Sequence, residues 1–410
     1  MASERPARIY LDHAATTRPD ERVIESMLPF LRERWHNPSS IYVEAQAARR
    51  AIDEARETVA SLLGARPEEI VFTSGGSESD NLALRGVLAA SRVRAAHLAP
   101  HIVTSAVEHH AVLDTAEQLG REGAEVTLVG VDREGVVSAS AVADAVRGDT
   151  VLVSVMHANN EVGAVNDLAS ISAAVRERNP RAVVHTDAVQ SAAHFALDVD
   201  RLGVDLLTMT AHKLYGPRGA GVLYVRSGTP LAPQITGGGQ ERDRRAGTEN
   251  TAAIVGLATS MRLAHEERES DLARDRALQA RLIEELPRRI PMLGITGPRE
   301  ASRRLPGNVS VVVGFVEGES ILLALDLAGV AASSGSACTT GSVEPSHVLV
   351  AMGVPADLAR GSLRITLGRE NAGGDVERLL MVLPPIVERM RALSPVKVEA
   401  PSEWGAWLVS

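Results

Sequence analysis

Cys338 is the only cysteine in this 410-residue chain, and it lies among small and polar residues. A lone cysteine is most often buried and packs like a small hydrophobic residue. Here its neighbours are Ser, Gly, Ala and Thr, and no bulky apolar residue flanks the thiol. Such a composition is typical of an exposed loop, where a thiol is a candidate nucleophile. A single cysteine also excludes a disulfide within the chain.

A carboxylate and a lysine end two neighbouring apolar runs. Asp187 follows the run 182–184, and Lys213 lies 26 residues later, after the run 205–210. Asp187 could be a helix-capping residue, and Lys213 could be a surface lysine that packs its aliphatic stem. The chemical alternative is a carboxylate that keeps a pyridinium nitrogen protonated and a lysine that forms a Schiff base. His109 could cover such a ring and exchange protons, although a lone histidine is more often structural.

The segment Ser74-Gly75-Gly76-Ser77 opens a predicted helix directly after a strand. Glycine lets a backbone approach an anion closely, and the amide groups at a helix start bind phosphate. The segment is not a Walker motif, because no Gly-Lys-Ser/Thr follows, and it lacks the dinucleotide spacing. Taken alone, it fits a simple capped helix equally well.

Short apolar runs alternate with helical patterns through the first half of the chain. The runs at 70–73, 101–105, 125–129, 150–156, 181–186 and 205–210 predict strands, and 220–225 predicts one more that could be antiparallel. This alternation predicts an α/β fold with a mostly parallel sheet covered on both faces. In such a sheet, ligands bind outside the carboxyl ends of the strands.

Five of these runs are followed by polar residues, which are therefore predicted to share one rim of the sheet. Any one cluster could be explained by helix capping, but five on one rim could not. The clusters are 74–79, then Glu108 and His109, then His157, Asn159, Asn160 and Glu161, then Asp187 and Gln190, and finally His212 and Lys213.

A second, smaller α/β unit follows a long helical pattern from Asn250 to about Arg289. The most charged part of that pattern, 265–271, is interpreted as the solvated face of a helix between two domains. Strands are predicted at 309–313 and 363–367, and helices at 319–327 and 375–393. Arg364 lies in the second strand, where alternation leaves open whether it faces solvent or a ligand carboxylate.

The tail 394–410 contains Trp404 and Trp407. We interpret it as a frayed or loosely docked end. A segment that docks a partner is the less favoured alternative.

Composition excludes several classes of function. The net charge is −9 and no basic run occurs, which argues against a nucleic-acid-binding surface. No run of about 18 apolar residues is present, so no membrane-spanning helix is expected. No secretory signal is visible, and with the single cysteine this favours a cytoplasmic location.

Several motifs together resemble the NifS/IscS-type (group I) cysteine desulfurases, which are fold-type I enzymes of the class V aminotransferase superfamily. The motifs run in the family's order over nearly the whole chain, and only the tail lies outside them. The family often has Ser-Gly where this chain has Thr210-Ala211, and a frequent Thr is replaced by Ser77. Both changes keep a hydroxyl group. The motifs are 10–17, 73–79, Glu108-His109, Asn159-Asn160-Glu161, 212–217, 333–339 and Arg364.

The resemblance implies pyridoxal 5'-phosphate (PLP) as the cofactor. Lys213 would hold PLP covalently, Asp187 would bind the ring nitrogen, and Gln190 the phenolic oxygen. His109 would stack on the ring and shuttle protons. The remaining residues that would contact the cofactor are Asn160 and, at its phosphate, Gly76, Ser77, Thr210 and His212.

The resemblance also implies substrate and partner contacts. Asn37 and Arg364 would bind the carboxylate of L-cysteine, and Cys338 would accept its sulfur as a persulfide. Thr248 would reach the phosphate of a neighbouring subunit, which implies a homodimer with shared sites. A protein sulfur acceptor is expected, such as an iron–sulfur scaffold or a thiolation protein. No metal site is expected, apart from Cys338 as a transient iron–sulfur ligand.

The expected organisation is an N-terminal segment (1–20) packed with the small domain, a large PLP domain (21–260), a small C-terminal domain (261–395) and a tail (396–410). The small domain would carry the cysteine loop at about 332–344. Two other readings remain open at this point. One is a selenocysteine lyase or another class V aminotransferase-type enzyme, and the other is a sulfur-carrier scaffold without activity.

Overall fold

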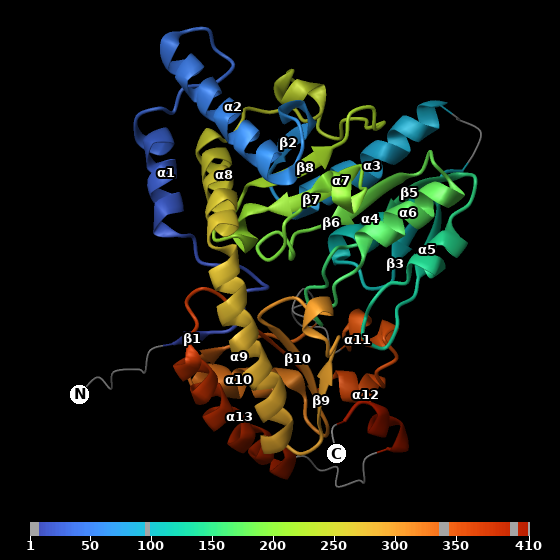
Figure 1. The fold of residues 1–410 in the computed structure, drawn as a ribbon, viewed down its shortest axis with the longest axis vertical. Helices are drawn as coiled ribbons and strands as arrows, with labels where there is room; N and C mark the ends of the chain where they lie inside the picture. Colours follow the sequence, from blue (N-terminus) through green and yellow to red (C-terminus); the bar gives the residue numbers. More distant parts are fainter. Residues whose placement is uncertain (1–7, 95–98, 336–343, 394–400, 409–410) are drawn as a thin grey trace.

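The structure is a computed structural model that describes residues 8–94, 99–335, 344–393 and 401–408 (Figure 1). A larger domain holds most of the first 266 residues, and a smaller one holds most of the rest. The helix pair α8 and α9 connects them, and the N-terminal segment returns to the smaller domain.

Seven strands form the sheet of the larger domain, in the order β2-β8-β7-β6-β5-β3-β4. Strand β8 is antiparallel to both of its neighbours, and the other pairs are parallel. The predicted seven-stranded, mostly parallel sheet is therefore confirmed. The strands are β2 (Ile70–Thr73), β3 (His101–Ser105), β4 (Glu125–Val129), β5 (Thr150–Ser154), β6 (Val183–Asp187), β7 (Leu206–Thr210) and β8 (Gly221–Val225).

Both faces of this sheet are covered, because successive side chains of a strand point to opposite faces. Phe72 packs into one core together with α2, α6 and α8, and its neighbour Val71 packs into another with α3 and α4. The helices of this domain are α1 (Glu21–Arg32), α2 (Val43–Leu63), α3 (Gly76–Arg94), α4 (His110–Arg121), α5 (Ala139–Ala145), α6 (Leu168–Arg178), α7 (Val199–Leu202) and α8 (Thr251–Glu266). Short 3-10 turns lie at η1 (Pro67–Glu69), η2 (Ala211–Lys213) and η3 (Gln240–Asp243).

The smaller domain is built on a three-stranded antiparallel sheet of order β12-β10-β9. Strand β9 (Leu293–Thr296) was not predicted, because its four residues include a glycine and show no clear alternation. The other elements are β10 (Asn308–Val313), β11 (Val330–Ala331), β12 (Ser362–Thr366), α9 (Arg268–Arg289), α10 (Gly318–Leu327), α11 (His347–Ala351), α12 (Ala356–Ala359), α13 (Gly373–Leu393), η4 (Ala301–Arg303) and η5 (Ser402–Ala406).

The N-terminal segment connects the two domains. Strand β1 (Ile9–Tyr10) pairs in parallel with β11 of the smaller domain. A few residues later, the backbone amide of Thr17 donates to the carbonyl of His212 in the larger domain. The segment therefore passes between the domains at the position where Lys213 ends η2.

The tail folds onto the smaller domain, so the interpretation of a frayed end is wrong for residues 401–408. Trp404 is 5% exposed and packs against Phe315 with ring centroids 5.0 Å apart. The guanidinium of Arg133, from the larger domain, lies 5.9 Å from the ring of Trp407. Burial of the Trp404 ring, with Trp407 half-buried, compensates for the ordering of a short chain end. Docking of a partner by the tail stays a prediction.

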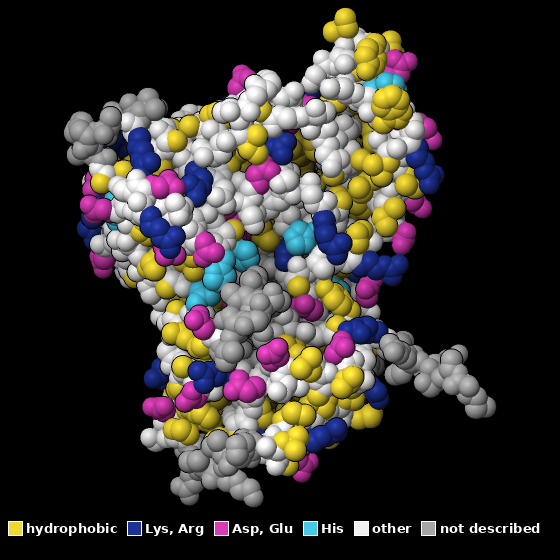
Figure 2. Space-filling view, turned by 180° about the vertical axis from the view of Figure 1, so that it is seen from behind, with side chains coloured by type: hydrophobic (Ala, Val, Ile, Leu, Met, Phe, Trp, Pro, Cys, Tyr) yellow, Lys and Arg dark blue, Asp and Glu magenta, His cyan; other side chains and the backbone are white. Residues whose placement is uncertain are grey.

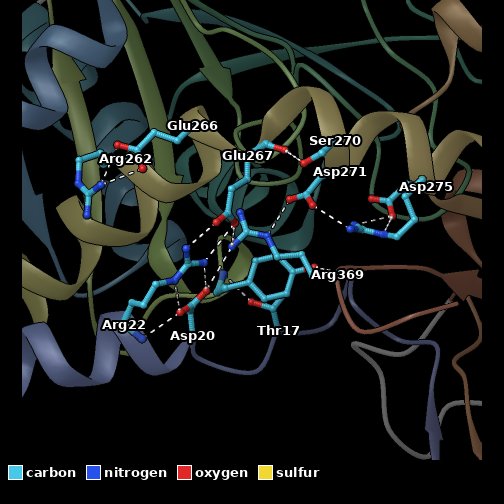
Figure 3. Close-up of polar contacts among 12 residues, drawn as sticks. Thr17, Asp20, Arg22, Arg262, Glu266, Glu267, Ser270, Asp271, Asp275 and Arg369 are labelled. Carbon is cyan, nitrogen blue, oxygen red and sulfur yellow. Dashed lines mark hydrogen bonds and ion pairs between the residues drawn. The ribbon is translucent and has the colours of Figure 1, made fainter.

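A cluster of ion pairs joins the domains where α8 meets α9 (Figure 3). Arg369 pairs with Asp271 at 2.7 Å, Glu267 at 3.1 Å and Asp20 at 3.5 Å. Its guanidinium also lies 4.5 Å from the ring centroid of Tyr215, two residues after Lys213. The interpretation of 265–271 as the solvated face of a helix between two domains holds for most of the stretch, but Glu267 and Asp271 are partly buried and pair with Arg369.

We expect the substitution Arg369→Met to lower the free energy of unfolding by about 1–3 kcal/mol, because three partly buried carboxylates each lose one cation. Each carboxylate keeps a second arginine, which is Arg22 for Asp20 and Glu267 and Arg274 for Asp271. The matched control is Arg262→Met, which removes an exposed i,i+4 pair with Glu266 shown in the same view. That pair should contribute less than about 0.5 kcal/mol. Urea unfolding of both variants measures the difference, and equal midpoints would contradict the assignment of Arg369.

Candidate active site

An open cavity of about 290 Å³ lies at the carboxyl end of the large sheet. All five predicted strand ends contribute side chains to it, and Arg364 enters from the smaller domain. This convergence follows from parallel strands that release their chains at one edge. The predicted site residues that line the cavity are Gly76, Ser77, His109, Asn160, Asp187, Gln190, Thr210, His212, Lys213 and Arg364.

One end of the cavity is suited to an anion. Helix α3 begins at Gly76, and Gly76 and Ser77 line the cavity from its first turn. A side chain at residue 76 would meet Val189 at 2.9 Å, so only glycine fits there without a shift of its neighbours. The backbone amides and dipole of a helix start favour phosphate. Thr210, at the end of β7, adds a hydroxyl group on the same wall.

Opposite charges face each other in the middle of the cavity. Asp187 ends β6 and is buried, and its Oδ1 accepts a hydrogen bond from the amide of Val189 at 2.8 Å. Burial raises the pKa of Asp187, and attraction to His109 and Lys213 opposes that rise. A cationic nitrogen placed against this carboxylate would keep it ionised.

His109 is held as the N-cap of α4. Its Nδ1 accepts a hydrogen bond from the amide of Ala111 at 3.1 Å, which places the ring proton of the neutral form on Nε2. Burial lowers the pKa of His109, and attraction to Asp187 opposes this. A neutral, fixed imidazole can cover an aromatic ring without placing a second cation beside Lys213.

Sequence reasoning missed Asp80, which also lines the cavity from α3. It is buried, and its Oδ1 has no hydrogen-bond partner among the described residues. Burial and repulsion from Asp187 raise the pKa of Asp80 well above its usual value. An unpartnered buried carboxyl atom marks a place for a donor or a cation. The available signal was its position one turn into the helix that follows the glycine segment.

Lys213 lies beside the N-terminal segment. Its Nζ donates to the carbonyl of Ala15 at 2.7 Å and to that of Ala14. The side-chain amide of Gln190 also donates to the Ala14 carbonyl, at 3.0 Å. The role of this segment as a wall of the cavity was not predicted, although it belongs to a quoted motif.

Arg364 is the charged group that the smaller domain contributes. All residues of β12 are buried, and Arg364 is 3% exposed, so it does not face solvent. It donates to Asp12 at 2.9 Å and to the carbonyl of Asn160 at 3.2 Å, and its buried Nε has no partner among the described residues. The structure thus excludes the solvent face that alternation left open, and a buried guanidinium with a spare donor is suited to a carboxylate.

Two predicted residues are described and do not line this cavity. Thr248 is exposed on the segment before α8, and Asn37 is exposed between α1 and α2, where its side chain accepts from the amide of Ser39 at 2.9 Å. Cys338 lies outside the described residues. Within the described part of the chain, no cluster of three or more His, Cys, Asp and Glu side chains is arranged to bind a metal, and no helix is long and apolar enough to cross a membrane.

The cavity fits PLP on its own chemistry. Its glycine-lined helix start suits the phosphate, the buried Asp187 suits the ring nitrogen, and Lys213 is placed for covalent attachment. Arg364 lines the same cavity, and its Nε, which has no partner among the described residues, is suited to an amino-acid carboxylate.

Comparison with known proteins agrees with this arrangement. A family model described as aminotransferase class-V matches residues 9–379. Cysteine desulfurase IscS of Dictyoglomus turgidum is 48% identical over 95% of this chain and 97% of its own length. Its counterpart from Methanosarcina thermophila is 45% identical over 95% of this chain and 94% of its own length.

Solved structures give the same result. A NifS-like protein matches with a TM-score of 0.86 and 36% identity, and covers 93% of this chain and 100% of its own. A structure of SspA in complex with cysteine matches with a TM-score of 0.76 and 35% identity, over 89% of this chain and 100% of its own. The chain therefore belongs to the class-V aminotransferase family and, within it, to the cysteine desulfurases of the IscS and NifS type.

Proposed function

We propose that this chain is a PLP-dependent enzyme that removes sulfur from L-cysteine, releases L-alanine and carries the sulfur as a persulfide on Cys338. The observation that carries this proposal is the cavity in which Lys213, Asp187 and Arg364 converge. A lysine for the cofactor, a carboxylate for its ring nitrogen and a guanidinium for an amino-acid carboxylate are the requirements of amino-acid chemistry on PLP.

Bound PLP supplies an electron sink for the bonding electrons at the α-carbon of an amino acid. In our proposal Asp187 keeps the ring nitrogen protonated, and Gly76, Ser77, Thr210 and His212 hold the phosphate. Gln190 holds the phenolic oxygen and Asn160 contacts the cofactor. Lys213 removes the α-proton, and His109 fixes the plane of the ring and exchanges a proton.

Arg364 orients the substrate in this account. Its guanidinium would grip the carboxylate while Asp12 and the carbonyl of Asn160 hold it in place. Asn37 does not reach this cavity within one chain, so its predicted share in carboxylate binding stays a prediction.

The transfer step needs no external oxidant. The thiolate of Cys338 attacks the sulfur of cysteine, an S–S bond forms, and the C–S bond breaks with its electron pair left on carbon. Proton return to that carbon gives alanine, so cysteine and a thiol become alanine and a persulfide. The attacking group must be a thiolate, because a serine hydroxyl is a much weaker nucleophile at neutral pH.

A homodimer is part of the proposal. Large apolar side chains are exposed between α1 and the start of α2, and Figure 2 shows hydrophobic side chains on that part of the surface. Such a patch on one chain favours an interface. Thr248 is exposed, as a residue that completes a neighbour's phosphate site must be in the free chain. The exposed apolar residues are Leu31, Trp35, Ile41, Tyr42 and Val43.

We further propose a protein sulfur acceptor, such as an iron–sulfur scaffold or a thiolation protein. The names of the IscS relatives are consistent with iron–sulfur assembly. A cytoplasmic location is proposed from the single cysteine, which suits a reducing compartment.

Incubation with L-cysteine and a reductant tests the function. We expect alanine and sulfide in equal amounts, because each turnover removes one sulfur and the reductant releases it from the persulfide. Parallel reactions with selenocysteine and with alanine plus a keto acid separate the alternatives. Turnover of selenocysteine without turnover of cysteine would contradict the proposal. Transfer of an amino group to the keto acid without release of sulfide would contradict it as well. No reaction would favour a scaffold.

A further inference from the structure

The structure describes the chain up to residue 335 and again from residue 344, and these two ends flank the segment that contains Cys338 (residues 336–343, the Cys338 segment). Both ends lie against one carboxylate, that of Glu161. On the N-terminal side, a side chain at Gly335 would clash with Oε2 of Glu161. On the C-terminal side, the hydroxyl of Ser346 donates a hydrogen bond to the same Oε2. Residues eleven positions apart thus lie against a single atom.

Glu161 is itself held firmly at the rim of the cavity. It is 5% exposed, its amide donates to the side chain of Asn159 at 2.8 Å, and its carbonyl accepts from the side chain of Asn308 at 3.2 Å. The residue before it, Asn160, lines the cavity. The carboxylate is therefore a fixed point beside the proposed site of chemistry.

The chain leading to the cysteine is fixed next to the proposed substrate-binding group. The amide of Arg364 donates to the carbonyl of Ser333 at 2.7 Å, and the amide of Ser333 donates back at 3.2 Å. Gly335 follows two residues later against Glu161. Cys338 is three residues beyond Gly335 in the sequence, and three residues of extended chain span at most about 11 Å.

The chain that leaves the segment is fixed at the same carboxylate. Ser346 is the N-cap of α11 and accepts from the amide of Leu349 at 3.2 Å, so its hydroxyl joins Glu161 to the start of that helix. The next residue, His347, contacts the carbonyl of Glu108 through Nε2 at 3.0 Å, beside His109. Figure 2 shows histidines gathered at the waist between the two domains.

Several charged groups face this carboxylate. Burial raises the pKa of Glu161 to about 7, and the hydrogen bond from Ser346 and the charges of Arg364 and His110 oppose the rise. Oε2 can accept the hydroxyl of Ser346 in either protonation state. The contact is therefore available across neutral pH.

We propose that Glu161 is a positioning residue for sulfur transfer, which fixes both described ends of the Cys338 segment at the rim through Ser346 and Gly335. It does not touch substrate or cofactor, and it acts through the geometry of the segment. The proposal rests on the proposed function, in which Cys338 receives the sulfur.

The test compares Glu161→Ala, Glu161→Gln and Ser346→Ala as PLP-loaded enzymes. Two readouts are the rate of persulfide formation on Cys338 in a single turnover and the alkylation rate of the Cys338 thiol. PLP content and the change in cofactor absorbance on cysteine binding show whether the cofactor and substrate sites remain intact. Ser172→Ala is the matched control, because that buried hydroxyl also donates one hydrogen bond, to the carbonyl of Leu202 at 2.8 Å.

We expect Glu161→Ala and Ser346→Ala to slow persulfide formation about tenfold or more and to change the alkylation rate, with PLP content and cysteine binding unchanged. Glu161→Gln, which keeps an acceptor oxygen, should recover most of the rate, and Ser172→Ala should match the wild type. Gly335→Ala should also slow transfer, and Glu161→Ala/Gly335→Ala should be no slower than Glu161→Ala, because the clash is then removed.

Wild-type rates of persulfide formation in Glu161→Ala and Ser346→Ala would overturn the proposal. A fall in rate that only follows a loss of PLP would overturn it as well, since the role would then be structural. Absence of persulfide in the wild type is a different result, and it would reject the proposed function itself.

Discussion

Replacement of Lys213 by alanine is expected to abolish turnover of cysteine, with a loss of at least about 10³-fold. The side chain would lose both of its proposed roles, as the covalent attachment of PLP and as the base at the α-carbon, and a general base alone contributes roughly 10²–10⁴-fold. The visible absorbance of the lysine-bound cofactor should disappear, while free PLP can still enter a cavity whose phosphate end is intact.

The low lysine content of the chain allows the residue that binds the cofactor to be assigned directly. The sequence contains only two lysines, Lys213 and Lys397. Borohydride reduction of the loaded enzyme should therefore place the cofactor on the peptide with Lys213 and leave the other peptide unlabelled. Labelling of Lys397, or retained activity in Lys213→Ala, would contradict the assignment. Lys213→Arg serves as the control that keeps the charge but cannot form the bond.

Cys338→Ser should remove turnover almost as completely, again by about 10³-fold or more, because an alcohol does not attack sulfur at neutral pH as a thiolate does. The cavity residues are untouched by this substitution, so cofactor content and the absorbance change on cysteine binding should stay at the wild-type level. Lys213→Ala loses the absorbance of the lysine-bound cofactor, and the two variants thus separate cofactor chemistry from sulfur transfer.

Undiminished release of alanine by Cys338→Ser would reject the role of Cys338. Because the chain has no other cysteine, no second thiol could substitute for it within the same protein. Loss of PLP from this variant would also contradict the account, since the account gives the thiol no part in holding the cofactor.

The residues at the carboxyl ends of the strands of the large sheet could be predicted, because each follows a local apolar run in the sequence. Apolar runs end at Asp187 and Thr210, and parallel strands carry such ends to one edge. The resemblance to a known family gave these residues roles, which the geometry of the cavity is consistent with but does not test.

Contacts between distant segments could not be predicted in the same way. The pair of Arg364 with Asp12 joins residues 352 apart in sequence, and Arg369 meets Asp20 over a similar separation. Within the charged stretch 265–271, the ion pairs of Glu267 and Asp271 were missed, because their partner Arg369 is far away in the sequence. Trp404 was taken for part of a loose end for the same reason, since its partner Phe315 is far away in the chain.

Asp80 and Glu161 show a further limit. Each carboxyl group looks like an ordinary polar residue after a strand or within a helix, and its importance depends on burial. Asp80 has an unpartnered buried oxygen, and Glu161 holds both ends of the Cys338 segment. Neither property has a signature in residue spacing.

The central claim is that the sulfur of cysteine passes to Cys338, and the mass of the protein tests it most directly. PLP-loaded enzyme is mixed with one equivalent of L-cysteine without reductant, and the peptide that contains Cys338 is analysed by mass spectrometry. We predict a gain of one sulfur atom on Cys338, reversed by reductant, with one alanine formed per persulfide. Formation of alanine while Cys338 stays unmodified would contradict the account.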